Sequence, residues 1–333
     1  MMQEKEKYMA RCIRLAQMGR TSVAPNPMVG AVIVDEAGSI IGEGWHRRYG
    51  EAHAEVNAVQ AVADPTRLRQ STLYVSLEPC SHYGKTPPCA DLIINKGIPR
   101  VVIGCEDPFP LVSGRGIHKL AEAGVQVEVG VLEQECRELI LPFATFHLRK
   151  RPYIILKWAQ SADGFLDRFR TEGKPVRLST DYTKMLVHKL RTECDAILIG
   201  SNTARLDNPV LTTRHWVGAN PLRVVLGNGS KLPRTLRLFD ETAPTLVHEG
   251  TLDELMDSLH ARNVETLMVE GGAAVLHAFL EADLWDEAVV EHSRVQLGAG
   301  VSAPVISQNF VMREECHFGV THVYYRHSAS RIN

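Results

Sequence analysis

Two short stretches of the chain contain residue types that bind a transition metal and use it. HAEVNAVQA begins at His53 and includes Glu55, and SLEPCSHYGKTPPCADLI (76–93) places Cys80 and Cys89 on either side of a loop. One imidazole and two thiolates suit the borderline-soft Zn²⁺ ion. A hydrolytic zinc site needs three protein ligands and one open position for water. These three residues therefore form a candidate hydrolytic zinc site.

The predicted elements around these residues favour reactive thiolates and leave one carboxyl group free for proton transfer. Cys80 follows a predicted strand, and Cys89 opens a predicted helix, whose amides and dipole stabilise a thiolate. Glu55 lies two residues after His53 and is not needed as a ligand. Zinc lowers the pKa of a bound water from ~15.7 to about 7. We therefore expect Glu55 to move a proton between this water, a ring nitrogen and a leaving group.

The order of these residues indicates a class of enzyme. An H-x-E pattern followed by P-C-x-x-C is typical of zinc-dependent nucleobase deaminases. This chain has HAE and EPC, but eight residues separate its two cysteines. The alternatives are a closed structural zinc site and buried cysteines without metal. A structural site usually recruits a fourth Cys or His, and it would give Glu55 no role.

The first half of the chain alternates apolar runs with helical patterns. The N-terminal stretch predicts an amphipathic helix with four apolar residues on one face: Met9, Cys12, Ile13 and Ala16. Strands alternating with helices of about ten residues predict a mainly parallel sheet with helices on its faces. The predicted strands are 29–45 (two strands around a turn), 72–79, 100–106 and 125–130, and the predicted helices are 53–63, 89–97 and 116–124.

A basic segment then separates the first half from a second alternation. The helical pattern of residues 132–151 runs into HLRKRP and the strand pattern YIILKWA. We place the boundary here and predict two domains, residues 1–147 and 148–333. The second domain should contain helices at 181–193, 252–263 and 272–282, and strands at 195–201, 222–228, 245–249, 265–272, 286–295 and 321–327.

Length, composition and charge narrow the class of protein. A chain of 333 residues with 44% hydrophobic residues is long enough for two cores. A net charge of −2 does not favour a nucleic-acid or acidic-membrane partner. No apolar run approaches the ~20 residues of a membrane span, and the N-terminus lacks the pattern of a secretory signal. Seven cysteines without regular spacing fit a reducing compartment, so we expect a cytoplasmic protein.

The loop EPCSHYGKTPPC is specific enough to indicate a family. Together with PNPMVGAVIV (25–34), GEGWHRRYGEAHAE (42–55) and DPFPLVSGRG (107–116), it resembles the bifunctional riboflavin-biosynthesis family RibD. Members of this family join a diaminohydroxyphosphoribosylaminopyrimidine deaminase to a 5-amino-6-(5-phosphoribosylamino)uracil reductase. The resemblance covers essentially the whole chain. It implies an α/β protein with an N-terminal cytidine-deaminase-like α/β/α zinc domain and a C-terminal dihydrofolate-reductase-like α/β domain.

The resemblance also implies which residues contact the deaminase substrate. These are Asn26, His46, His82 and Lys85, with Asp107 nearby. Lys85 supplies a point charge for phosphate, and an Asn side chain both donates and accepts at a ring edge. Taken singly, Asn26 could be a turn former and His46 a surface histidine. The chain has Phe109 where the family often has Asn, so we leave this residue out of the site.

In the second half, the resemblance implies an NADPH-dependent reductase. LKWAQSADG, KLRTECDAILIGSNTARLDNPVLTTR and VEGGAAVLHAF carry the match. They imply substrate contacts from Arg191, Leu211, Arg214 and Glu270. They imply NADP contacts from Ala159, Thr203, Asp207, Asn228, Gly272, Ala273, Ala274, Val275 and Leu276.

Residue chemistry supports part of this assignment. The glycine pair lets the backbone approach a pyrophosphate at a helix start, and arginines suit a sugar phosphate. Either arginine taken singly could be a solvated surface residue. The chain lacks G-x-G-x-x-G, which disfavours a Rossmann domain. It departs from the family at Pro175 and Arg177, where Ser and Trp are usual.

The predicted activity is therefore a pair of reactions on a small pyrimidine ribosyl phosphate. Zinc-dependent hydrolytic deamination removes an exocyclic amine, and NADPH then reduces the ribosyl chain to a ribityl chain. We expect a homo-oligomer, a dimer through the reductase domain, with no nucleic-acid or membrane partner. Two alternatives remain: a cytidine or tRNA deaminase with a non-catalytic NADP-binding domain, and a regulatory module held together by zinc. Glu55 distinguishes the regulatory module from an enzyme, because a structural zinc site does not need this residue.

Overall fold

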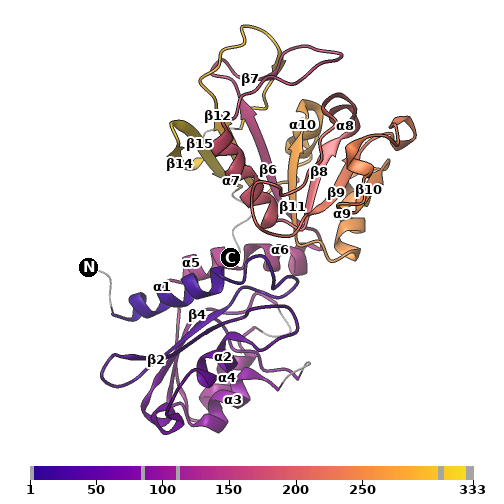
Figure 1. Ribbon diagram of the computed structural model, residues 1–333. Helices are drawn as coiled ribbons and strands as arrows, with labels where there is room; N and C mark the ends of the chain where they lie inside the picture. The colour runs from indigo at the N-terminus through magenta and orange to yellow at the C-terminus, as the bar shows by residue number, and fades with distance from the viewer. Residues whose placement is uncertain (1–3, 84–86, 110–112, 307–310, 328–333) are drawn as a thin grey trace. The chain divides into compact units, whose positions relative to one another are not determined.

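The computed structural model describes residues 4–83, 87–109, 113–306 and 311–327. The chain forms two compact units that meet in sequence between Arg149 and Lys150, inside the segment HLRKRP (Figure 1). None of the helices that the structure describes combines the length and the apolar character needed to cross a membrane.

The N-terminal unit is built on a five-stranded sheet with the strand order β2-β1-β3-β4-β5. β1 pairs antiparallel with both β2 and β3, whereas β3, β4 and β5 run parallel. The sheet is therefore mixed and not mainly parallel as expected, because the β1–β2 hairpin adds antiparallel strands at one edge. The strands are β1 (Gly30–Val34), β2 (Ile40–Trp45), β3 (Thr72–Leu77), β4 (Arg100–Cys105) and β5 (Gln126–Val129).

Helices cover both faces of this sheet, because successive strand residues point to opposite sides. Ala31 and Ile33 join the core beneath α2 (Ala54–Gln60), α3 (Cys89–Lys96) and α4 (Arg115–Glu122). Val32 and Val34 join the core beneath α1 (Glu4–Gln17) and α5 (Glu133–Leu139). The result is the α/β/α arrangement that the sequence predicted (Figure 1). On α1, Met9, Cys12 and Ala16 are buried, and Ile13 is half-buried.

The C-terminal unit contains an eight-stranded sheet with the order β10-β9-β8-β11-β6-β12-β15-β14. The pairings from β10 to β12 are parallel, and the last two are antiparallel. Its strands are β6 (Tyr153–Gln160), β8 (Ala196–Gly200), β9 (Leu222–Leu226), β10 (Thr245–His248), β11 (Thr266–Gly271), β12 (Glu287–His292), β14 (Val311–His317) and β15 (Val320–Arg326). A separate ladder pairs β7 (Phe165–Asp167) with β13 (Val301–Ser302).

Helices pack on the parallel part of this sheet. Leu255 and Leu259 of α9 and Phe279 of α10 pack against Leu156 and Leu198 of the strands. The helices of this unit are α7 (Asp181–Thr192), α8 (Ser201–Asp207), α9 (Leu252–Ala261) and α10 (Ala273–Glu281), and α6 (Leu141–Arg149) precedes it. Short 3₁₀ helices lie at Pro65–Gln70, Gly229–Lys231 and Arg237–Phe239. The sequence patterns did not predict α8, β7, β13 or β14.

Candidate metal centre and cofactor cavity

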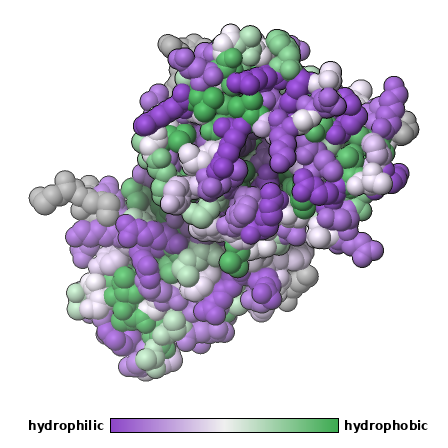
Figure 2. Space-filling view, turned by 45° about the horizontal axis from the view of Figure 1, so that its top comes forward, coloured by the Kyte–Doolittle hydropathy of each residue, from purple (hydrophilic) through white to green (hydrophobic). Residues whose placement is uncertain are grey.

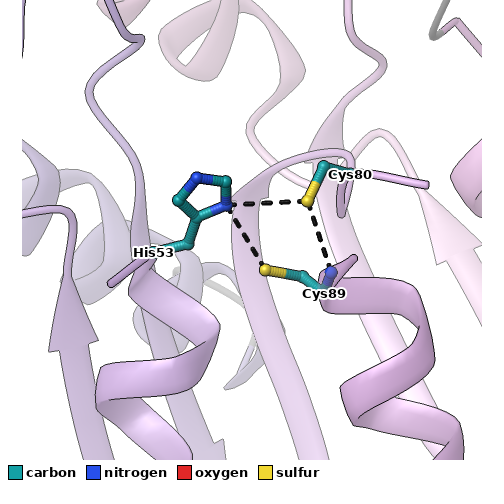
Figure 3. A group of neighbouring side chains, drawn as sticks. All are labelled: His53, Cys80 and Cys89. Atoms are coloured by element: carbon teal, nitrogen blue, oxygen red, sulfur yellow. Dashed lines mark hydrogen bonds between the residues drawn. The ribbon is translucent and has the colours of Figure 1, made fainter. Parts of the chain in front are cut away.

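Three side chains from separate elements meet at one end of the N-terminal sheet. His53 is the residue before α2, Cys89 is the first residue of α3, and Cys80 lies in the loop after β3. Their side chains point toward one another (Figure 3). The His53 Nδ1 atom lies 3.4 Å from the Cys89 Sγ and 3.6 Å from the Cys80 Sγ. All three donor atoms lie within 4.8 Å of one another.

Close backbone packing fixes the start of α2, and therefore His53. A Cβ atom on Gly44 would lie 2.4 Å from the Ala58 nitrogen and 2.5 Å from the Ala54 oxygen. Only glycine lets β2 approach the helix this closely. At α3, the backbone N–H of Cys89 donates to the Cys80 Sγ at 3.3 Å, which joins the two cysteines across the loop (Figure 3).

The group has the chemistry of a zinc site with an open position. Two thiols and one imidazole are the softer ligands that zinc accepts. The Cys89 side chain lowers the pKa of Cys80, whereas Cys80 and burial raise the pKa of Cys89. Of the two thiols, Cys80 is the one that these contacts favour as a thiolate. Within the described part of the chain, this group has three members, one fewer than a tetrahedral ion needs.

Glu55 lies directly beside these three side chains. It is on the first turn of α2 and is 3% exposed. Burial, and then the charge of Cys80, raise the pKa of Glu55 to about 7. A carboxyl group with such a pKa exchanges protons readily near neutral pH. The role of Glu55 beside the three possible ligands stays a prediction.

Of the predicted substrate residues, His46 lies next to His53, and Asn26 contacts His46. The rings of His46 and His53 meet edge to face with centroids 5.4 Å apart. His46 Nδ1 is 3.1 Å from the Ala52 carbonyl oxygen, and His46 Nε2 is 3.1 Å from the Asn26 Nδ2. Since Nδ1 donates to the carbonyl, Nε2 accepts from the amide. His46 is 2% exposed, so it is not a surface histidine.

Of the remaining predicted residues of this site, the structure describes His82 and Asp107. His82 is exposed, and Lys85 lies outside the described residues. Burial raises the pKa of Asp107 to about 6, the charges of Glu78 and Cys80 also raise this pKa, and the charge of His82 lowers it. Asp107 Oδ1 accepts a hydrogen bond from the Phe109 N–H at 2.8 Å. The Phe109 ring packs against His147.

The C-terminal unit contains a cavity of about 860 Å³ near the carboxyl ends of its parallel strands. Figure 2 shows hydrophilic side chains bordering a hollow in this unit. Nine of the predicted reductase residues line the cavity: Ala159, Arg191, Thr203, Asp207, Arg214, Glu270, Gly272, Ala273 and Leu276. This volume is within the range of ~300–1,000 Å³ that ligand pockets occupy.

The glycine pair forms a tight entry into α10. Gly272 has φ +79° and ψ 143°, a conformation that side chains disfavour. A Cβ atom there would lie 2.5 Å from the Thr203 Oγ1. The turn therefore brings bare backbone to the cavity at a helix N-terminus, which is the arrangement that pyrophosphates bind.

Two arginines at the cavity already hold carboxylates. Arg191 Nη2 donates to Glu270 Oε2 at 2.8 Å, and Arg191 Nη1 donates to the Thr212 carbonyl at 3.0 Å. Burial opposes the ionisation of Glu270, but Arg191 outweighs it, and the pKa of Glu270 is lowered. Asp207, a predicted NADP contact, forms an ion pair with Arg170.

The other residues considered in the sequence differ in whether they line this cavity. Four predicted residues are not among those that line the cavity: Leu211, Asn228, Ala274 and Val275. Pro175 lines it, whereas Arg177 forms an exposed ion pair with Asp181. Lys157 and His188 line the cavity but were missed. Lys157 had a detectable signal, because it is the single charged residue in the apolar pattern YIILKWA.

Comparison with known proteins matches both units. Residues 2–105 match the family model of the cytidine and deoxycytidylate deaminase zinc-binding region, and residues 152–320 match the RibD C-terminal domain.

Full-length relatives agree with these matches. The riboflavin biosynthesis protein RibD of Aquifex aeolicus is 38% identical over 327 residues, covering 91% of this chain and 90% of its own. RibD of Escherichia coli strain K12 is 35% identical over 333 residues, covering 89% of each. A crystal structure of a Thermotoga maritima protein aligns with this chain at a TM-score of 0.88 and 36% identity, covering 97% of this chain and 98% of that one. That protein is a diaminohydroxyphosphoribosylaminopyrimidine deaminase/5-amino-6-(5-phosphoribosylamino)uracil reductase. The chain therefore belongs to the RibD family of riboflavin biosynthesis proteins.

Proposed function

We propose that the chain catalyses two consecutive steps of riboflavin biosynthesis. The N-terminal domain (1–147) deaminates 2,5-diamino-6-(5-phosphoribosylamino)pyrimidin-4(3H)-one. The C-terminal domain (148–333) uses NADPH to reduce the product to 5-amino-6-(5-phosphoribitylamino)uracil. The observation that carries the proposal is the convergence of His53, Cys80 and Cys89 beside the buried Glu55. A deaminase with a non-catalytic second domain is not favoured, because the family joins both activities.

In the deamination, His53, Cys80 and Cys89 would hold one Zn²⁺ ion. When bound, zinc would supply a water molecule that ionises near neutral pH. The Glu55 carboxylate would accept the two protons of the attacking water in turn, passing one to the ring nitrogen and the other to the amine, which leaves as ammonia. Asn26 and His46 orient the pyrimidine ring, and His82, Lys85 and Asp107 complete the substrate contacts.

In the reduction, the protein mainly positions the two reactants. NADPH would supply a hydride, and the turn from Gly272 to Leu276 would hold its pyrophosphate. Ala159, Thr203, Asp207 and Asn228 complete the cofactor contacts. Arg191, Leu211, Arg214 and Glu270 hold the sugar phosphate of the substrate. Placing the nicotinamide against the ribosyl carbon then supplies most of the rate enhancement. We also propose a homodimer through this domain, to be measured by sedimentation.

The test is to supply the diaminopyrimidine substrate to the zinc-loaded enzyme and to follow ammonia release and NADPH oxidation separately. The proposal requires both signals, with ammonia appearing first. Ammonia release without NADPH oxidation would remove the reductase assignment. If the enzyme with full zinc occupancy released no ammonia, it would not be a deaminase of this substrate. The zinc site would then be structural, or the enzyme would act on a different base.

A further inference from the structure

Glu78 is a buried carboxylate with four backbone partners. It lies two residues before Cys80 and is 4% exposed. Its Oε2 atom accepts from the N–H groups of Asp107 at 3.2 Å and Gly114 at 2.9 Å. Its Oε1 atom accepts from Gly116 at 2.8 Å and from Ile117 at 3.3 Å. A carboxylate can satisfy four donors because both of its oxygens are acceptors only.

These hydrogen bonds connect two separate parts of the N-terminal unit. Glu78 belongs to the segment after β3 that carries Cys80, whereas its partners lie after β4 and on the first turn of α4. The two segments also touch through backbone, since a Cβ atom on Gly116 would lie 2.1 Å from the Pro79 oxygen. Asp107, at the start of the second segment, is held to Glu78 by its own N–H.

We propose that Glu78 is a positioning residue for the deamination. It fixes Asp107 and the start of α4 relative to the Cys80 segment, so that the metal ligands and the Asp107 carboxyl group face the same substrate. This inference rests on the proposed deaminase function. It assigns a role to the Glu of the EPC segment that is distinct from metal binding and from proton transfer.

The isosteric substitution Glu78→Gln tests this role. Whichever way the amide is oriented, its NH₂ group replaces an acceptor and faces two backbone donors, so two of the four bonds are lost. We expect the KM for the diaminopyrimidine to rise about ten-fold or more. Zinc content, kcat and NADPH oxidation with pre-deaminated substrate should stay close to those of the wild type. Glu122→Gln, at the exposed end of α4, is the matched control and should leave KM unchanged.

A double-mutant cycle with Asp107→Asn separates positioning from general destabilisation. If Glu78 acts through Asp107, adding Glu78→Gln to Asp107→Asn raises KM much less than ten-fold. Should Glu78→Gln not fold, Glu78→Asp keeps the charge with a shorter reach and should give an intermediate KM. An unchanged KM, additive effects, or loss of zinc from a folded variant would each overturn the inference. Failure of the proposed function itself is distinguishable, because the wild type would then release no ammonia.

Discussion

Substituting Gly272 by alanine should damage NADPH binding more than it damages the fold. The backbone conformation of Gly272, φ +79° and ψ 143°, costs other residues about 1–3 kcal/mol. The new Cβ atom would also lie 2.5 Å from the Thr203 Oγ1, so the Thr203 side chain must rotate and give up its 3.4 Å contact with the Gly271 oxygen. Together these effects amount to roughly 2–4 kcal/mol. Relief of this strain moves the first turn of α10, which would carry the pyrophosphate.

The assay is titration of NADPH, followed by its fluorescence, into Gly272→Ala and into the control Gly298→Ala. Gly298 has a similar φ of +76°, but no heavy atom lies within 4 Å of a Cβ built there. Both positions have a positive φ, so alanine strains the backbone in both variants. Only Gly272→Ala should weaken NADPH binding, by about ten-fold or more, since each 1.4 kcal/mol corresponds to about a factor of ten. Equal NADPH affinity in both variants would refute the assignment of the cofactor to this turn.

Three further substitutions test other parts of the account. Cys89→Ser should lower the zinc content measured by atomic absorption and abolish ammonia release, while NADPH oxidation with pre-deaminated substrate continues. Arg191→Lys should raise the KM for the deaminated substrate about ten-fold, because one ammonium group cannot replace the fork that reaches Glu270 and the Thr212 carbonyl. Glu265→Gln should change the pH dependence of urea unfolding. Burial, and then Asp195, raise the pKa of Glu265 from 4.5 to about 8, so the folded state binds the extra proton and wild-type stability falls as pH rises between these values. The variant should lack this slope and be more stable by a few kcal/mol at pH 8.

Local residue patterns were sufficient to predict most of the elements and the metal-binding group. The helix that Cys89 opens ends at Gly97, which adopts the left-handed conformation expected of a helix-ending glycine. Strand alternation placed Val32 and Ile33 on opposite faces of the sheet. The three donor residues were recognisable because few other arrangements use two cysteines, one histidine and a nearby acid.

Features that depend on distant contacts were not predictable in this way. The orientation of β1 against β3 is set by pairing between residues that lie 38 to 44 positions apart in the chain, and no local pattern encodes it. α8 is a short helix of seven residues, SNTARLD, whose place depends on its packing after β8. Glu78 stood in a motif that the sequence highlighted, but its four partners lie more than 28 residues away. Its role is visible only in three dimensions.

The most direct test of the central claim is the behaviour of Glu55→Gln, which removes the proton carrier and preserves side-chain volume. This variant should fold, keep its zinc and still oxidise NADPH with pre-deaminated substrate. Its ammonia release should fall by about 10²–10⁴-fold or more, the range associated with a general acid–base group. A zinc-loaded variant that releases ammonia at the wild-type rate would rule out Glu55 as the proton carrier.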